Sequence, residues 1–408
     1  MSIRRPIQSS APRRLRRHRL RGSRPRASSA GFTLLELMVA LVAGAIAITS
    51  IYFVSSASSR HFHEQQRIAQ SQMNLRTAAA QIRRDFSRAG YLGSPNTVKE
   101  TVCPDATGSV DASATDFGAI EVLDGDATGV LAEAATNGVE ADTVRLTGNF
   151  ASGDAYKVAG TQTSTTLNFA TTWQGFRRSF GVPYDDALFT SVMKVGRFVH
   201  IVNDGNGGHW FAAITSVSAA TTPQTITIDR GLPDCFRRCV DGCTLSPLSK
   251  IEYKVIGMSD AAGGITALNP GTLAVLGNTG AVLVRRELTF ANVLVPNSER
   301  IVAEYVADFD VDLISNTQLG AGLPLALALQ DDANAETVST ANPHLVRSAI
   351  ISLSLRTSTE DQRFPYVARA VGAALTRYDI NTAIVGAARV RTTNLEVLLP
   401  NVAMQDIR

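Results

Sequence analysis

The chain has 408 residues, 45% of them hydrophobic, which is enough for one large domain or two ordinary ones. Its formal net charge of +3 is unevenly spread: ten of the 39 Lys and Arg residues lie in the first 31 positions, which leaves 29 basic against 36 acidic residues beyond them. This acidic remainder argues against a nucleic-acid-binding protein, and 31 Gly with only 6% aromatic residues favour a loop-rich β domain over a helical bundle.

The first 54 residues divide into a basic leader and an apolar segment. The leader, residues 1–31, contains ten Arg and no Asp or Glu, and it ends in the small residues 28–31. The apolar segment, residues 32–54, has a single charge, Glu36. A helix of this length, at about 1.5 Å per residue, crosses a bilayer core of about 30 Å. Because basic residues stay on the cytoplasmic side, we expect one membrane pass with the rest of the chain in the periplasm.

Glu36 has two interpretations within this segment. An acid at the centre of a membrane helix costs about 2.5–3.5 kcal/mol, so such residues usually have a function. Close to the start of the helix, however, the carboxylate can also reach the headgroups of a plain membrane anchor. Position alone does not separate these alternatives.

The junction between the leader and the apolar segment is more specific. An ordinary secretory signal is cut after its apolar stretch, whereas the small residues here precede it. Gly31 followed by Phe32-Thr33-Leu34-Leu35-Glu36 resembles the type III signal of type IV prepilins and pseudopilins. The resemblance implies a prepilin peptidase that cuts after Gly31, N-methylation of the new N-terminal residue Phe32, and a conserved-type acid at Glu36.

The same arrangement has a physical rationale. After cleavage, Phe32 carries an α-ammonium in apolar surroundings, and Glu36 carries a carboxylate nearby. In a bundle of such helices, the Glu36 carboxylate can pair with the N-terminal amine of a neighbouring subunit, which satisfies both charges. Glu36 is therefore predicted to act in assembly by setting the register between subunits.

A polar helix is expected to continue from the apolar segment. Four residues recur every seven positions on one face: Ile68, Leu75, Ile82 and Ala89. No Pro or Gly interrupts residues 45–89, so one continuous helix from Phe32 to about Ala89 is predicted, ended by Gly90 and Pro95. Its second half should lay an apolar stripe on a globular domain.

From residue 94 onward, short apolar runs alternate with Gly, Ser, Thr and Asp. The runs predicted to form strands are 119–123, 142–147, 196–202, 210–217, 225–229, 250–256, 281–288, 301–314, 347–356 and 395–399. Since no helical period separates them, they predict a largely antiparallel sheet system. Residues in the 260s and 270s and residues 315–345 are expected to be long surface loops. Residues 203–208, rich in Asn and Gly, are expected to form a hairpin turn, because the acid that a calcium loop needs is missing.

The four cysteines are Cys103, Cys235, Cys239 and Cys243. In an oxidising compartment an even number favours two disulfides, with three possible connectivities. Every connectivity links Cys103 to one of the other three across more than 130 residues. The spacing of Cys235, Cys239 and Cys243 leaves a metal site as the alternative, but it is not a zinc-knuckle spacing and no His lies nearby. We therefore expect no metal and no cofactor.

Three C-terminal segments extend the family resemblance. Residues 306–312, 346–357 and 389–397 resemble the closing strands of PilW-type minor pilins and, less closely, those of the minor pseudopilin J of type II secretion. The resemblance implies an α+β, pilin-like fold in which a long N-terminal helix packs on a large, mainly antiparallel β domain with long loops. The predicted parts are a cleaved leader (1–31), a membrane or filament-core half of the helix (32–54), an amphipathic half (55–93) and a periplasmic or extracellular β domain (94–408).

Three functional hypotheses follow. The first is a minor type IV pilin, or alternatively a J-like pseudopilin, that acts as a structural subunit at or near the pilus tip. It would first be anchored in the inner membrane by one pass and would then join the extracellular pilus. The implied partners are prepilin peptidase, other minor pilins, the major pilin, the inner-membrane assembly platform, the membrane and a large tip adhesin, but no nucleic acid. The second is a membrane-anchored enzyme, disfavoured because the sequence has no recognisable catalytic motif; His200 or His209 with Asp204 lacks a nucleophile. The third is an adhesive or ligand-binding role of the β domain.

Overall fold

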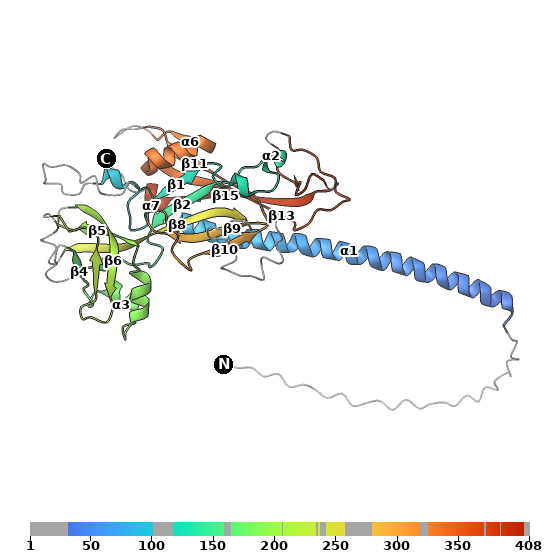
Figure 1. Cartoon of the computed structure of the whole chain (residues 1–408), viewed down its shortest axis with the longest axis horizontal. Coiled ribbons are helices and arrows are strands. Elements are labelled where there is room, and N and C mark those ends of the chain that lie inside the picture. The colour runs from blue at the N-terminus through green and yellow to red at the C-terminus, as the bar shows by residue number, and fades with distance from the viewer. Residues whose placement is uncertain are drawn as a thin grey trace, which may run out of the picture. The chain divides into compact units, whose positions relative to one another are not determined.

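The computed structural model describes residues 32–100, 117–158, 165–205, 207–233, 236, 242–257, 280–318, 325–370, 373–383 and 385–403. The chain divides into two compact units, Met1–His63 and Glu64–Arg408. The long helix α1, Leu34–Phe86, contributes residues to both units, and the strands belong to the second (Figure 1). The predicted α+β, pilin-like class, a long apolar helix followed by a mainly antiparallel β domain, is confirmed.

The first unit presents its apolar side chains outward. Leu37, Ile46 and Phe53 are 61%, 63% and 68% exposed, although each would be expected in a core. Among the described residues, α1 is the one helix long and apolar enough to cross a membrane, with a mean hydropathy of 2.4 in its most apolar stretch. Thr49 Oγ1 donates to the carbonyl of Ala45 at 2.7 Å, so its polar group is satisfied within the helix.

In the second unit, the remainder of α1 buries one face. Its buried apolar residues are spaced three or four apart: Leu75, Ala78, Ile82 and Phe86. The continuous helix predicted from sequence is confirmed, but it ends at Phe86 rather than near Ala89. Hydrogen bonds from Arg88 to Asp85 and from Ala89 to Phe86 tighten the chain into turns, and Gly90 then takes a positive φ of 74°.

The larger sheet has ten strands, and every pairing between them is antiparallel. Its strands are β1 (Ile120–Leu123), β2 (Thr143–Gly148), β3 (Tyr156–Lys157), β4 (Thr166–Asn168), β5 (Phe198–Asn203), β6 (His209–Ser218), β7 (Thr225–Ile228), β8 (Cys243–Gly257), β9 (Ala281–Leu288) and β10 (Arg300–Glu304). The 15-residue strand β8 joins its two parts, because the first half of β8 pairs with β5 and the second half pairs with β2 and β9.

The smaller sheet has five strands in the order β12-β11-β13-β15-β14. Its strands are β11 (Val306–Asn316), β12 (Leu327–Gln330), β13 (Val346–Arg356), β14 (Arg377–Tyr378) and β15 (Ala388–Leu398). Strand β11 alternates, with Phe309, Val311 and Leu313 buried and the residues between them partly exposed. A parallel bridge between Ala141 and Phe309 links the two sheets.

Two large hydrophobic cores and two small clusters of buried residues lie among the described residues of this unit. The first contains the buried face of α1 together with apolar residues of both sheets, including Ile82, Phe86, Leu146, Phe309 and Ile351. The second lies entirely within residues 151–245 and is rich in aromatic rings, including Tyr156, Phe169, Phe176, Phe180 and Phe189.

Several sequence-based expectations need correction. The predicted single strand 301–314 is two strands, β10 and β11, because Tyr305 between them has a φ of 56° and breaks the extended chain. The expected loop 315–345 instead contains the end of β11, strand β12 and helix α6 (Asp332–Ala341).

The expectation of strands without intervening helices is also wrong. The structure has the short helices α2 (Ala134–Asn137), α3 (Gln174–Phe180), α4 (Asp186–Val192) and α7 (Pro400–Ala403) besides α6, and the 3₁₀ turns η1 (Thr97–Lys99), η2 (Thr128–Val130) and η5 (Pro343–Leu345). Helices of two turns or fewer give too few repeats for a periodic pattern to emerge. The predicted turn at residues 203–208 is confirmed between β5 and β6, while the loop predicted in the 260s and 270s lies outside the described residues.

Candidate functional site

The start of α1 is organised around Thr33 and Glu36. The Thr33 backbone N–H and hydroxyl both donate to Glu36 Oε2, at 2.9 and 3.0 Å, and the Glu36 N–H donates to Thr33 Oγ1 at 3.2 Å. This reciprocal arrangement is a capping box, in which two side chains satisfy backbone donors at a helix start. The pattern Thr33-x-x-Glu36 is the sequence signature of a capping box, so this hydrogen-bonding role of Glu36 was predictable in addition to its charge.

The capping box holds the carboxylate of Glu36 within one helical turn of Phe32. Phe32 itself is 88% exposed, and Leu34 and Leu35 beside it are 79% and 71% exposed. Within the first unit, Glu36 therefore lies among outward-facing apolar side chains with Thr33 as its described partner. A carboxylate accepts up to about four hydrogen bonds, so it keeps capacity for a cationic donor while it caps the helix. Gly31, the other residue of the predicted processing site, lies outside the described residues.

This geometry agrees with the comparison against protein families. Residues 26–52 match the model described as the prokaryotic N-terminal methylation motif. The match supports a type IV pilin-like or pseudopilin-like protein. Comparison with curated proteins and with solved structures gives no match. The apolar helix and the motif together fit a single-pass, membrane-anchored pilin-like chain.

The cysteines bear on the export prediction. Cys243, at the start of β8, is disulfide-bonded and fully buried in the second core. Its partner is one of Cys103, Cys235 and Cys239, which lie outside the described residues. The connectivity therefore stays open among the three possibilities.

His200 and His209, which the enzyme hypothesis considered, contact each other and the backbone of Leu92. His200 Nε2 lies 2.9 Å from His209 Nδ1, and His200 Nδ1 lies 3.0 Å from the carbonyl oxygen of Leu92. Burial, together with the charge of His209, lowers the pKa of His200 to about 3, so His200 is neutral and donates to Leu92 from Nδ1. Asp204 does not join them, because it pairs with Lys157 and accepts from Thr244 Oγ1 at 3.0 Å.

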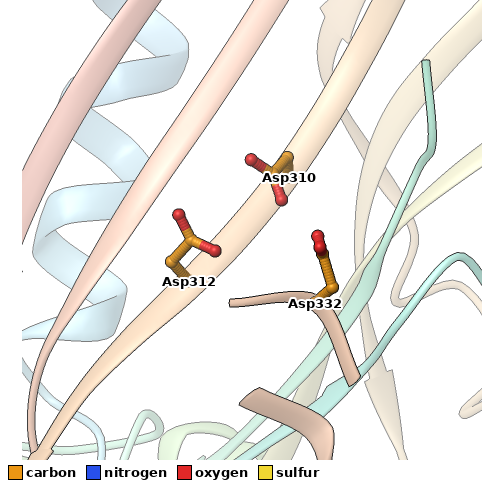
Figure 2. A group of neighbouring side chains, drawn as sticks. All are labelled: Asp310, Asp312 and Asp332. Atoms are coloured by element: carbon orange, nitrogen blue, oxygen red, sulfur yellow. The ribbon is translucent and has the colours of Figure 1, made fainter. Parts of the chain in front are cut away.

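Acidic side chains of β11 and α6 form the best-arranged group for a cation in the described parts of the chain. Carboxylate oxygens of Asp310, Asp312 and Asp332 lie within 4.8 Å of one another, and Figure 2 shows Asp310 and Asp312 along one strand with Asp332 opposite. Burial and the charges of Asp312 and Asp142 raise the pKa of Asp310 to about 7, and burial raises that of Asp142 to about 6. Protonation can thus relieve the repulsion without an ion, and the group alone does not define a metal site.

Proposed function

We propose that the chain is a minor type IV pilin of the PilW type, a structural subunit of pilus assembly and initiation that sits at or near the pilus tip. The observation that carries the proposal is the methylation motif over residues 26–52, ending within an outward-facing apolar helix with Glu36 at its start. An enzymatic activity is not part of the proposal. The alternative within the same family is a J-like pseudopilin of type II secretion.

The apolar half of α1 supports a role in a helical bundle. Leu41, Ile48 and Ile51 are 67%, 70% and 68% exposed, so this half has no apolar cover of its own. Lipid covers such a surface before assembly, and helices of other subunits would cover it in a filament. The partners proposed are prepilin peptidase, the assembly platform in the inner membrane, the major pilin and other minor pilins, with a large tip adhesin beyond them.

The size of the β domain supports the PilW type over pseudopilin J. After cleavage behind Gly31 of the 408-residue chain, the mature region would have 377 residues. The second unit carries 15 strands in two sheets among its described residues, and a domain of this bulk suits the end of a filament, where neighbours do not enclose it on every side.

Substitutions of Glu36 test the proposal, because they separate charge from helix capping. Gln at the third helical position also completes a capping box, so Glu36→Gln keeps the cap and removes the charge. We expect Glu36→Gln and Glu36→Leu to be exported, cleaved and folded, yet absent from filaments, because the neighbour's N-terminal amine would stay unpaired in apolar surroundings at a cost of several kcal/mol. Thr33→Val removes the capping hydroxyl and keeps the charge, so it should still incorporate.

The measurement is the ratio of this chain in sheared filaments to that in the membrane fraction, read by immunoblot in cells that make pili. Glu36→Asp, shorter by one methylene, should give an intermediate ratio. Equal incorporation of Glu36→Leu and the unmodified chain would leave Glu36 as a plain anchor residue. Incorporation of Glu36→Gln but not of Thr33→Val would assign the residue to helix capping alone.

A further inference from the structure

A pocket of about 370 Å³ opens over strands β1, β2 and β8 of the larger sheet. Its polar floor consists of Glu121, Arg145 and Lys250, one residue from each strand. Phe117 and Phe290, whose ring centroids are 4.7 Å apart, contribute apolar wall. Pockets of this size with apolar walls and a few convergent polar groups are the usual form of a small-ligand site.

Most charges on this face of the sheet are matched by strand pairing. The register places Glu121 opposite Arg145, Arg145 opposite Glu252, and Glu252 opposite Arg286. Arg145 lies 3.3 Å from Glu121 and 3.0 Å from Glu252, and Arg286 also pairs with Glu252. Opposite charges thus alternate across four strands, which is the favourable order for cross-strand neighbours.

Lys250 is a further cation beside this row, and it shares its carboxylate partner, Glu121, with Arg145. On β8 it lies two residues before Glu252, opposite Thr147 of β2, and it is only 7% exposed. Its described ion-pair partner is Glu121, at 3.5 Å between Nζ and Oε2, and Glu121 already accepts from Arg145. An ammonium has three N–H donors, and leaving buried donors unsatisfied costs free energy. The Lys250 side chain lines the pocket, so an acceptor inside it would complete the coordination.

Cationic side chains outnumber carboxylates in the described lining of the pocket, and one of them, Arg145, is already paired with Glu121 and Glu252. Its lining includes three cationic side chains, Lys99, Arg145 and Lys250, against one carboxylate, Glu121. Lys99 is exposed at the rim, whereas Lys250 is buried at the floor. An anion that enters would meet Lys250 in a desolvated setting, where a charge-assisted hydrogen bond is stronger than at the surface.

Hydrogen bonds hold the described part of the rim, around residues 94–100, in place. Asn96 caps the turn η1 by accepting from the Val98 N–H at 3.0 Å. Its side-chain amide also lies 3.2 Å from His344 Nδ1, which ties the turn to the segment before β13. Ser94 Oγ donates to Glu100 at 2.7 Å on the other side of the turn. A preformed site of this kind loses little conformational entropy on binding.

We propose that this pocket binds a carboxylate group carried on a small apolar body, with the Lys250 ammonium as its principal partner and Lys99 at the entrance. The carboxylate fits Lys250, and the apolar body fits the phenyl walls formed by Phe117 and Phe290. Two sources present this chemistry: a free small carboxylic acid, or the C-terminal carboxylate of a peptide that ends in an apolar residue. This site is independent of the N-terminal methylation motif and goes beyond a purely structural subunit.

The test is calorimetric titration of the full chain in detergent micelles at low salt, with 3-phenylpropionate as the acid and 3-phenylpropionamide as its uncharged match. We expect the acid to bind about tenfold more tightly than the amide, and Lys250→Met to abolish that difference. Lys254→Met is the matched control: Lys254 lies on the same strand, pairs with Asp126 at 2.6 Å and does not line the pocket, so the difference should persist.

A second arm separates the sources, using N-acetyl-Ala-Phe with a free or an amidated C-terminus. If the free peptide binds about tenfold more tightly than 3-phenylpropionate, the ligand is a chain terminus; if it binds no better, a small acid is the ligand. Equal affinities for acid and amide in the unmodified chain would overturn the proposal, as would an unchanged difference in Lys250→Met. Lys99→Gln, at an exposed position, should weaken acid binding about threefold and provides a variant that does not disturb the floor.

Discussion

The two halves of α1 use the same secondary structure for opposite surroundings. Residues 34–63 expose nearly all their apolar side chains, with Phe53 at 68%, whereas residues 64–86 bury a narrow stripe that ends in Phe86 at 0%. Up to residue 54 the first half is apolar on every side, as a helix in lipid or in a bundle of helices is, and residues 55–63 are mostly polar. The second half is polar except along the stripe, as a helix on the surface of a water-soluble domain is.

The comparison shows that burial along α1 depends on what packs against each part of the helix and not on hydrophobicity alone. Val39, Leu41 and Val42 are apolar and exposed, yet Ala78, with a much smaller side chain, is fully buried. One helix therefore serves two environments, and substitutions of the same chemical type should have different consequences in each half.

The largest effect is expected at the end of the leader. A substitution there should prevent processing next to the first half of α1 and leave the packing of the second half unchanged. Gly31→Leu should block cleavage, because a bulky residue would replace the small residue that precedes Phe32 in the proposed processing site, and the protein should then stay in the membrane with its leader attached. Intact mass of membrane-extracted protein reads this directly. Gly44→Leu is the matched control, since a Cβ at Gly44 meets no atom within 4 Å, and this variant should be processed normally.

Contrary results would be informative. A mature Gly31→Leu protein that begins at Phe32 would show that cleavage does not depend on Gly31. An unmodified chain that keeps Arg24 or Arg26 would mean that these residues are not a cleaved leader.

A smaller effect is expected from the same substitution placed in each half. Phe86→Ala should lower the free energy of unfolding of the globular unit by about 3–5 kcal/mol, because it leaves a cavity among buried residues of the first core. Phe53→Ala should change it by less than about 0.5 kcal/mol, because its ring contributes nothing to that core. Denaturant unfolding in detergent, followed by tryptophan fluorescence, compares the two. Equal losses would mean that the first half of α1 stabilises the globular unit.

The smallest effect concerns β11, which also has one buried apolar face and one polar face. Asp310, on the polar face, has a folded pKa of about 7, above its ordinary value of 3.8, so folding favours its protonated form. Its contribution to stability is fully present below about pH 4 and is lost as the pH rises through 7. Asp310→Asn should therefore match the unmodified chain at pH 4 and exceed it by about 1 kcal/mol at pH 7.5, after discounting for partial exposure and coupling.

Melting temperatures of both proteins between pH 4 and 8 give the comparison. Ser352→Ala, opposite Asp310 in the register, is the control and should not change the pH dependence. A less stable Asp310→Asn at pH 7.5 would mean that the carboxylate has a favourable partner, and added calcium would then identify a cation at Asp310, Asp312 and Asp332.

Local patterns predicted the elements that local physics determines. The apolar segment, the stripe on α1 and the alternating strand β13 all follow from residue spacing. The short helix α4 also carries a local signal, since Asp185 accepts from the N–H groups of Ala187 and Leu188 as an N-cap. The Gly, Pro and Asp residues just before this helix are equally typical of a turn, so the N-cap pattern alone does not predict a helix here.

Features that depend on distant pairing could not be predicted from the sequence. Arg145 meets Glu252 only because β2 and β8 pair across 107 residues, and nothing near Lys250 in sequence shows that its ammonium would line a pocket. The break at Tyr305 is similar, because Tyr disfavours positive φ, and its conformation is imposed by the two sheets that it joins.

The confinement of the second core to residues 151–245 bears on how this chain could tolerate change in length. Gly148, at the end of β2, is the register partner of Ser249 in β8, so the chain leaves the first core and returns to it at adjacent positions. Residues 149–248 therefore form one long insertion between two neighbouring, paired positions of β2 and β8. Such a segment can change in length or sequence without shifting the register of β1, β2 and β9, as long as it keeps its contacts with the rest of the unit, which include the Arg197–Glu287 ion pair and the packing of Phe198 on Phe290. A change within residues 149–248 should therefore leave the packing of α1 on the first core intact.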